Sequence, residues 1–404
     1  MRFLIHINQL LYPADTGGKI RSSKLFEKLS KEHELTIVCF RRPGESDAQL
    51  ALMRACCADL VTVDRRETEK FTPRFYWELA ANVFSPHPYI VRKYYDRRME
   101  ARIRELLAER RFDVLLCDFL QPSLNLTSIP FYPRIIFEHN VESIIRKRHY
   151  QQAANPAAKL YLYLQWRKLH RYEKRAAEVF DHCIMVSEQD CRLMAEEYGA
   201  RNTSAIPTGV DADFFSPGGP EDDANAIVFT GSMDWLPNED GIRWFVEVVL
   251  PRIRRELGVR LFIVGRNPSP AIRQLARHNH DVEVTGTVDD VRPWMARSKV
   301  YVVPLRIGGG TRIKIFEAMA MGKAVVSTTV GAEGLPVTDG GNIALADDPE
   351  QFARKVIDLL RDPDARRRLG DAGCTMVRES YTWDVAAKRF GEICEQVAQQ
   401  RRRG

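Results

Sequence analysis

The chain has 404 residues, of which 45% are hydrophobic and 28% charged, and its formal net charge is +6 at pH 7. This length predicts two domains, or at most three. The positive charge is mild for the size, so it permits an acidic partner but gives no reason to expect a nucleic acid. The eight cysteines form no Cys-x-x-Cys pair and no cluster with histidine. We therefore expect free thiols in a reducing compartment and no structural zinc.

The start of the chain and its apolar runs bear on its location. Met1 leads almost directly into the apolar run 3–7, without the charged leader, apolar core and cleavage site of a signal peptide. No stretch approaches the roughly 20 apolar residues of a membrane span. We expect a cytoplasmic protein.

Short apolar runs alternate with helix-like segments through the first half of the chain. We expect strands at residues 2–7, 34–39, 59–63, 113–118, 134–137 and 182–187, and helices at about 19–31, 45–57, 155–179 and 188–198. This alternation predicts a parallel sheet. The run 214–223, rich in proline, glycine and acidic residues, is the best candidate for a linker. We place the first domain at residues 1–206 and the linker at 207–225.

The same alternation begins again after the linker. Strands are expected at residues 227–230, 259–264, 282–284, 300–304 and 324–327, within a second domain at 226–378. The tail at 379–404 is predicted to be helical. Its apolar stripe has near-helical spacing and consists of Tyr381, Trp383, Ala386, Phe390 and Ile393.

A glycine loop stands where a predicted strand of the second domain ends and a helix begins. Gly308-Gly309-Gly310-Thr311 follows the strand at 300–304, and the helix starts at Arg312. Open α/β sheets bind ligands at such points. Glycines let a ligand approach the backbone, and a helix N-terminus suits a phosphate. Arg312 and Lys314 add positive charge, and Glu317 lies one turn further, within reach of a ribose. The loop therefore indicates a nucleotide diphosphate, and a tight turn with solvated charges is the alternative.

Two regions are rich in basic residues. Residues 65–111 hold twelve Lys/Arg against seven Asp/Glu, interleaved with aromatic residues, and residues 146–175 hold nine Lys/Arg and one acid. A basic, aromatic surface suits an anionic membrane face or a diphospho-lipid. The alternative is a helix-rich insertion with solvated charges and core aromatics, and we favour it slightly because aromatics in such segments are most often core.

The order and spacing of several motifs resemble the GT-B glycosyltransferases, specifically glycosyltransferase family 4, across nearly the whole chain. The matching segments are Gly17-Gly18, the strand ending at His139, 186–187, 207–215, 228–232, 262–265 and, most specifically, the glycine loop through 317–326. Within the family, the run 233–238 resembles a branch linked to bacterial exopolysaccharide synthesis.

The resemblance implies an α/β fold of the GT-B type, with two doubly wound, Rossmann-like parallel-sheet domains facing a central cleft. It implies a retaining transfer, with a nucleotide-sugar donor on the C-terminal domain and an acceptor on the N-terminal domain. The terminal helix would cross back to the N-terminal domain. No cofactor and no metal would be needed, because helix ends and cations hold the diphosphate. The donor-binding residues would be Gly17, Gly18, Gly231, Ser232, Gly310, Thr311, Arg312, Lys314 and Glu317.

The chain departs from the family pattern at two places. The family usually carries two glutamates eight positions apart, and Glu317 matches the second. Gly309 stands at the first, so the carboxylate that helps to hold the sugar is absent. The family also often has an arginine and a lysine after the glycine that matches Gly231, whereas the run 232–238 has neither. We expect Arg312 and Lys314 to replace them as phosphate cations.

His139 and Glu317 are the predicted catalytic residues. His139 follows an apolar strand, and the family places a histidine there, close to the transferred sugar or the acceptor. Its expected role is to orient reacting groups or to stabilise developing charge. A structural histidine is the alternative. The run Asp211-Ala212-Asp213 has the form of a metal-binding motif, but we interpret it as a linker turn and expect no metal site.

These observations predict a retaining hexosyltransferase-type enzyme that moves a sugar from a nucleotide diphosphate sugar to a glycan or lipid-linked glycan acceptor in cell-surface polysaccharide synthesis. We expect peripheral contact with the anionic inner face of a membrane and no nucleic-acid partner. Two alternatives remain, which are a nucleotide-sugar epimerase on the same fold and a non-catalytic nucleotide-sugar-binding partner in a polysaccharide complex.

Overall fold

A computed structural model describes residues 1–219, 225–307 and 313–400. The chain forms two compact units. The first unit is Met1–Pro207 together with the chain from Ala386 onward, and the second unit is Thr208–Val385. Both units are α/β and each is built on one parallel sheet.

The sheet of the first unit has seven strands in the order β3-β2-β1-β4-β5-β6-β7. Their bounds are β1 Arg2–Ile7, β2 Glu34–Arg41, β3 Asp59–Asp64, β4 Val114–Asp118, β5 Arg134–Phe137, β6 His182–Met185 and β7 Thr203–Ala205. Every pairing is parallel. The carboxyl ends of all seven strands therefore meet at one edge, which is where ligands bind in open α/β sheets.

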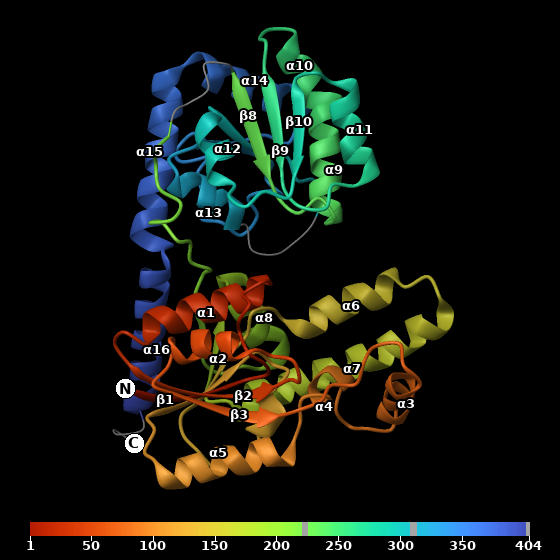
Figure 1. Cartoon of the computed structure of the whole chain (residues 1–404), viewed down its shortest axis with the longest axis vertical. Helices are drawn as coiled ribbons and strands as arrows, with labels where there is room; N and C mark the ends of the chain where they lie inside the picture. Colours follow the sequence, from red (N-terminus) through yellow and green to blue (C-terminus); the bar gives the residue numbers. More distant parts are fainter. Residues whose placement is uncertain (220–224, 308–312, 401–404) are drawn as a thin grey trace. The chain divides into compact units, whose positions relative to one another are not determined.

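Helices cover both faces of this sheet. They are α1 Gly17–Leu29, α2 Asp47–Arg54, α3 Pro73–Asn82, α4 Tyr89–Arg92, α5 Arg97–Glu109, α6 Glu142–Gln152, α7 Pro156–Val179, α8 Glu188–Tyr198 and the 3-10 turn η1 Ser123–Asn125. Figure 1 shows α1 and α2 on one face and α5 on the other. This is the doubly wound arrangement, and it explains why β1, β2 and β4 are almost wholly buried.

The sheet of the second unit has six parallel strands in the order β10-β9-β8-β11-β12-β13. The strands are β8 Ala226–Thr230, β9 Arg260–Val264, β10 Val282–Gly286, β11 Val300–Val303, β12 Ala324–Ser327 and β13 Ala344–Leu345. The helices are α9 Leu236–Trp244, the π-helical turn η2 Phe245–Val249, α10 Leu250–Arg254, α11 Pro270–His278, α12 Arg292–Arg297, α13 Ile313–Ala320, α14 Pro349–Arg361 and α15 Pro363–Ser380.

The last helix, α16 Trp383–Gln400, begins in the second unit and packs on the first. Phe390 meets Phe137 of β5 with ring centroids 5.4 Å apart. A Cβ added at Gly391 would lie 2.7 Å from His33 Nε2, so the helix lies close against the end of α1. The helical conformation is interrupted between α15 and α16, where Thr382 pairs with Val210 in an isolated β-bridge.

In the described ranges 1–219, 225–307 and 313–400, no helix combines the length and the apolar character needed to cross a bilayer.

Candidate active site

In the first unit, three elements bring polar side chains together at the carboxyl edge of the sheet. Asp118 ends β4, His139 follows β5 by two residues, and Ser22 lies in the second turn of α1. His139 Nε2 is 2.8 Å from Asp118 Oδ1, and Ser22 Oγ donates to Asp118 Oδ2 at 2.6 Å. All three side chains are buried. Ser22 Oγ also lies 3.5 Å from His139 Nε2. Both groups nevertheless make their shorter contact with Asp118, so this is not the arrangement of a serine nucleophile and its base.

The protonation of His139 follows from its surroundings. Burial lowers the pKa of its imidazole, against the opposing effect of Asp118, so the ring is neutral near pH 7. The Asp118 carboxylate can only accept, so the single ring proton is on Nε2. Nδ1 then carries a lone pair, and it is buried without a hydrogen-bond partner among the described residues. An unsatisfied buried acceptor costs about 1–3 kcal/mol, which a ligand hydroxyl would recover.

The ring of His139 is held in place by aromatic packing. It stacks on Phe119 with centroids 3.9 Å apart and an interplanar angle of 10°. Gly18 lies over this pair, because a Cβ added there would approach Phe119 Cζ to 2.6 Å and His139 Nδ1 to 3.9 Å. Gly17 starts α1 and faces open space. The two glycines therefore leave the helix N-terminus open beside His139.

Arg21 adds a positive charge to this group. Its side chain is buried, and Nη2 has no hydrogen-bond partner in the described part of the chain. Burial lowers the pKa of Arg21 to about 10, opposed by the charges of Asp118 and Asp190. The guanidinium is therefore charged at neutral pH.

Glu138 and Glu142 lie close to His139 in the sequence. Glu138 is buried, and burial raises its pKa, with the charges of Glu173 and Glu142 adding to the effect. Glu142 starts α6, and its carboxylate accepts a hydrogen bond from Gln121 at 3.1 Å. The raised pKa of Glu138 favours its protonated, neutral form.

In the second unit, two glycines make close backbone approach at the carboxyl edge of the sheet. Gly231 follows β8 with φ +158°, and Gly265 follows β9 with φ +154°. A Cβ at Gly265 would lie 1.8 Å from the carbonyl oxygen of Gly231. A Cβ at Gly231 would lie 2.7 Å from both Lys314 Nζ and Asn238 Nδ2. Gly265 therefore has no room for a side chain, and a side chain at Gly231 would displace Lys314 and Asn238.

Lys314 and Ser232 are joined to this edge through Asn238. Lys314 Nζ donates to Asn238 Oδ1 at 2.8 Å, and Asn238 Nδ2 donates to the carbonyl oxygen of Ser232 at 2.8 Å. The structure therefore brings together Gly231, Ser232 and Lys314, three of the predicted donor-binding residues. The ammonium group of Lys314, which lies in the first turn of α13, and the glycine turn at Gly231 lie together here. A positive charge, a helix N-terminus and exposed backbone are the features that favour phosphate binding.

Arg266 is a second cation at this edge, which the sequence analysis did not identify. Its Nε donates to Ser232 Oγ at 2.9 Å. Ser232 in turn donates to Asp234, which accepts from Asn267 at 2.9 Å. Arg266 directly follows the strand-end glycine Gly265, and that position was the signal that could have identified it.

Glu317 lies one turn after Lys314 on α13 and is partly buried. Burial raises the pKa of its carboxyl group to about 7, against the opposing charge of Lys314. A hydrogen bond from a ligand hydroxyl would stabilise the ionised form of this carboxyl group.

Part of the predicted donor site falls in the glycine loop. Gly310, Thr311 and Arg312, together with Gly309 where a glutamate was expected, lie outside the described residues. Asp211 Oδ1 accepts from the backbone N–H of Phe214 at 3.1 Å, as in a turn. No cluster of three or more His, Cys, Asp or Glu side chains suited to a metal occurs within 1–219, 225–307 and 313–400.

Two family models match the chain. The model described as Glycosyltransferase Family 4 matches residues 24–214, and the model described as Glycosyl transferases group 1 matches residues 224–362. The chain belongs to these group 1, family 4 glycosyltransferases, and its fold is GT-B. It is a retaining enzyme that takes its sugar from a nucleotide sugar.

Individual relatives are distant. An uncharacterized 44.6 kDa protein in the cps region of Klebsiella pneumoniae is 19% identical over 389 residues, which cover 92% of this chain and 94% of that protein. A phosphatidyl-myo-inositol mannosyltransferase of Mycobacterium tuberculosis is 29% identical over 228 residues, which cover 53% of this chain and 59% of the mannosyltransferase. Anabaena Alr3699/HepE in complex with UDP has a similar fold, with a TM-score of 0.66, 13% identity and coverage of 98% of this chain and 100% of that one.

Proposed function

We propose that this glycosyltransferase adds a sugar to a glycan or lipid-linked glycan during synthesis of a bacterial cell-surface polysaccharide. The similar protein of the Klebsiella cps region supports the polysaccharide, and the similar mannosyltransferase, whose name includes phosphatidyl-myo-inositol, supports a lipid-linked acceptor. The observation that carries the transfer is the convergence of Lys314, Asn238 and Gly231 at one sheet edge.

In this proposal the donor diphosphate lies against Gly231 and is neutralised by Lys314 and Arg266. Arg312 is included as a further phosphate-binding cation because of its position in the sequence, directly after the glycine loop. Glu317 accepts hydrogen bonds from the ribose hydroxyls. Charge-assisted hydrogen bonds of this kind are the strong ones, so a few of them suffice to fix a diphosphate without a metal ion.

His139 has a positioning role toward a sugar in the same proposal. Its free Nδ1 lone pair accepts a hydrogen bond from a sugar hydroxyl, while Asp118 fixes the tautomer through Nε2. Its function is therefore to orient a hydroxyl, because a lone pair cannot stabilise developing negative charge. Arg21 and the open N-terminus of α1 supply positive potential nearby.

The test is a transfer assay with UDP- and GDP-linked hexoses and lipid-linked saccharide acceptors, read by mass spectrometry. We expect release of the nucleoside diphosphate and an acceptor heavier by one sugar. An isomerised nucleotide sugar without transfer would instead identify an epimerase. Nucleotide binding without turnover of any donor and acceptor pair would identify a non-catalytic binding partner.

Lys314→Gln should weaken nucleoside diphosphate binding by roughly tenfold or more, because it removes a charge-assisted contact to phosphate. Titration calorimetry with UDP and GDP measures the effect. Lys299→Gln removes a lysine of the same unit that contacts Asn225 instead, and it should leave affinity unchanged. Equal affinities of the two variants would remove Lys314 from the donor site.

A further inference from the structure

The first unit contains a basic cavity that the proposed transfer does not use. It has a volume of about 370 Å³ and lies beside α3 and α4, where the chain leaves β3. Five basic side chains line it, namely Arg65, Arg66, Arg74, Arg92 and Lys93, together with the aromatic side chains Trp77, Tyr89 and Tyr95.

The acidic side chains of the cavity are already paired. Glu67 contacts Lys93 at 2.7 Å and Arg42 at 2.6 Å. Glu78 accepts from Thr68 at 2.5 Å and from Arg74 at 3.4 Å. By contrast, Arg65, Arg66 and Arg92 form no salt bridge with any residue that the structure describes. Three positive charges therefore remain for a ligand.

Arg65 is held in position without using all its donors. Its guanidinium lies 4.7 Å from the ring centroid of Phe40 and 5.8 Å from that of Tyr94. Nη1 is buried and has no hydrogen-bond partner within the described residues. A guanidinium fixed by stacking presents planar donors that match phosphate oxygens.

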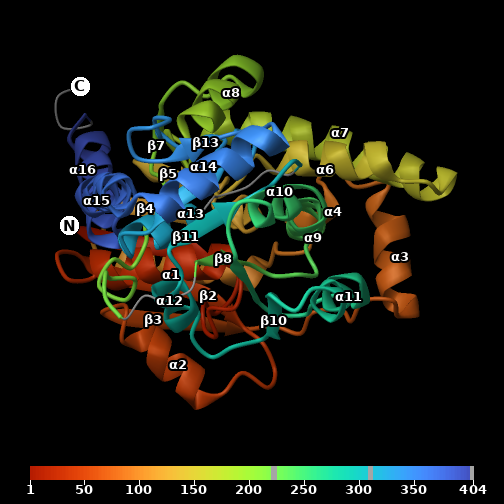
Figure 2. The same ribbon diagram turned by 90° about the horizontal axis from the view of Figure 1, so that it is seen from above.

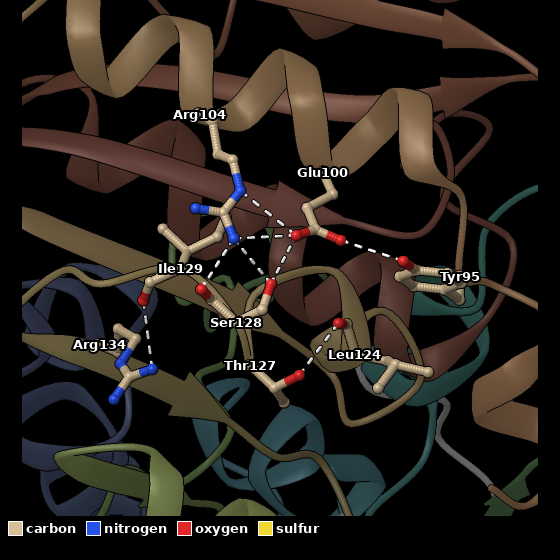
Figure 3. A network of polar contacts seen from close by, with 8 residues as sticks. All are labelled: Tyr95, Glu100, Arg104, Leu124, Thr127, Ser128, Ile129 and Arg134. Atoms are coloured by element: carbon tan, nitrogen blue, oxygen red, sulfur yellow. Dashed lines mark hydrogen bonds and ion pairs between the residues drawn. The ribbon is translucent and has the colours of Figure 1, made fainter.

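The walls of the cavity are tied to the rest of the unit. Tyr95 donates to Glu100 at 3.1 Å, and Glu100 is held by Arg104 and Ser128, as Figure 3 shows. At the end of α3, Asn82 Oδ1 accepts from Gln165 of α7 at 2.9 Å, and the backbone of Asn82 accepts from Lys168 at 2.7 Å. Figures 1 and 2 both place α3 beside α7. A cavity with walls fixed in this way loses little entropy on binding.

Large aromatic side chains are exposed on α3 and just beyond its two ends. Phe71, Trp77 and Phe84 are 78%, 70% and 91% exposed. Their local sequence, 70–84, also holds Lys70 and Arg74. Aromatic residues beside basic ones are typical of segments that lie in the interface of an anionic membrane.

We propose that the cavity binds the phosphate or diphosphate of a membrane lipid, with the aromatic edge of α3 inserted in the interface. The inference rests on the proposed function, because it assigns the lipid end of the acceptor to this site. The carboxyl ends of β3 and β5 are four strands apart, or roughly 19 Å. The sugar of a lipid-linked acceptor would then lie at His139 while its phosphate stays in the cavity.

Two binding assays, neither of which needs a donor or turnover, test this site. Titration calorimetry uses inorganic pyrophosphate, and flotation uses vesicles of phosphatidylcholine with or without phosphatidic acid. The exposed pair Arg66→Gln/Arg92→Gln should weaken pyrophosphate binding by roughly tenfold or more and abolish flotation with phosphatidic acid. Arg97→Gln removes an exposed charge outside the cavity and should change neither. All these substitutions lie in the first unit, so any pyrophosphate that binds to the second unit contributes equally to every titration.

A second variant separates the two parts of the proposal. Phe71→Ala/Phe84→Ala, which changes two exposed aromatic residues outside the cavity, should abolish flotation and keep pyrophosphate binding. If the double arginine variant binds pyrophosphate as tightly as Arg97→Gln, the phosphate site is wrong. The arginine substitutions could weaken pyrophosphate binding while the unaltered protein fails to float with phosphatidic acid vesicles. That result would identify the ligand as a free phosphate compound and would overturn the lipid. Transfer activity of the unaltered protein is measured separately, so failure of the proposed function remains distinguishable.

Discussion

His139→Ala should reduce turnover by about a hundredfold or more, because loss of one positioned catalytic contact commonly has that effect. The variant removes the buried Nδ1 acceptor and the contact of Nε2 with Asp118, while the hydrogen bond from Ser22 to Asp118 remains. Steady-state kinetics on the assay described above gives kcat and KM separately. We expect the loss mainly in kcat, since the contact orients a reacting group.

Two further variants distinguish this role from a structural one. Asp118→Asn keeps the shape but lets an amide donate to Nε2, so the ring proton moves to Nδ1 and the acceptor is lost. Its kcat should fall and its pH profile should change. His182→Gln replaces a partly buried histidine at the opposite edge of the sheet, whose Nε2 meets Ser204 at 3.0 Å, and should keep full activity. Unchanged turnover in folded His139→Ala would exclude the histidine from the mechanism.

Glu317→Gln should weaken donor binding by roughly tenfold or more while making the protein more stable at neutral pH. Binding falls because a neutral amide accepts more weakly from ribose hydroxyls than a carboxylate does. Stability rises because burial, which raises the pKa of Glu317 from 4.5 to about 7, disfavours the ionised form in the folded protein. The amide carries no charge and avoids that cost.

The sign of the pH dependence follows from the raised pKa. Below pH 4.5 the group is protonated in folded and unfolded chains, so it contributes nothing. Between pH 4.5 and about 7 the unfolded chain releases the proton first, so the free energy of unfolding decreases as pH rises. Above that range the cost is constant, at about 1–3 kcal/mol for a partly buried group.

Denaturant unfolding at several pH values measures this effect. The advantage of Glu317→Gln over the unaltered protein should be present above pH 7 and should disappear below pH 4.5. Glu247→Gln removes an exposed carboxylate of the same unit and should show neither the gain nor the loss of donor affinity. A pH-independent difference in stability would contradict the raised pKa of Glu317.

The positions of most strands were predictable from sequence because parallel strands are buried on both faces and form continuous apolar runs. The expected strand at 34–39 is β2, Glu34–Arg41, and the expected strand at 134–137 is β5. The pairing of Thr382 with Val210 between α15 and α16 was not predictable, since the two residues are distant in sequence.

The candidate site was only partly visible in the sequence. His139, Gly18, Gly231 and Lys314 were named as candidates because their motifs are local. Ser22, Asp118, Arg21 and Arg266 were missed, because each acquires its role from a partner on another element. The Asp118–His139 contact, for example, joins the ends of neighbouring strands that are 21 positions apart.

The sequence by itself therefore determined the fold class, the family and the local motifs, since these depend on apolar periodicity and on short runs of glycine and charge. Tertiary structure decided the protonation, the hydrogen-bond partners and the neighbours of the candidate side chains. Burial favours the neutral form of His139, and its Nδ1 has no hydrogen-bond partner among the described residues. The fold also brings the ammonium group of Lys314 next to Gly231, which lies on a separate segment. These properties arise from desolvation and distance, which a linear sequence does not contain.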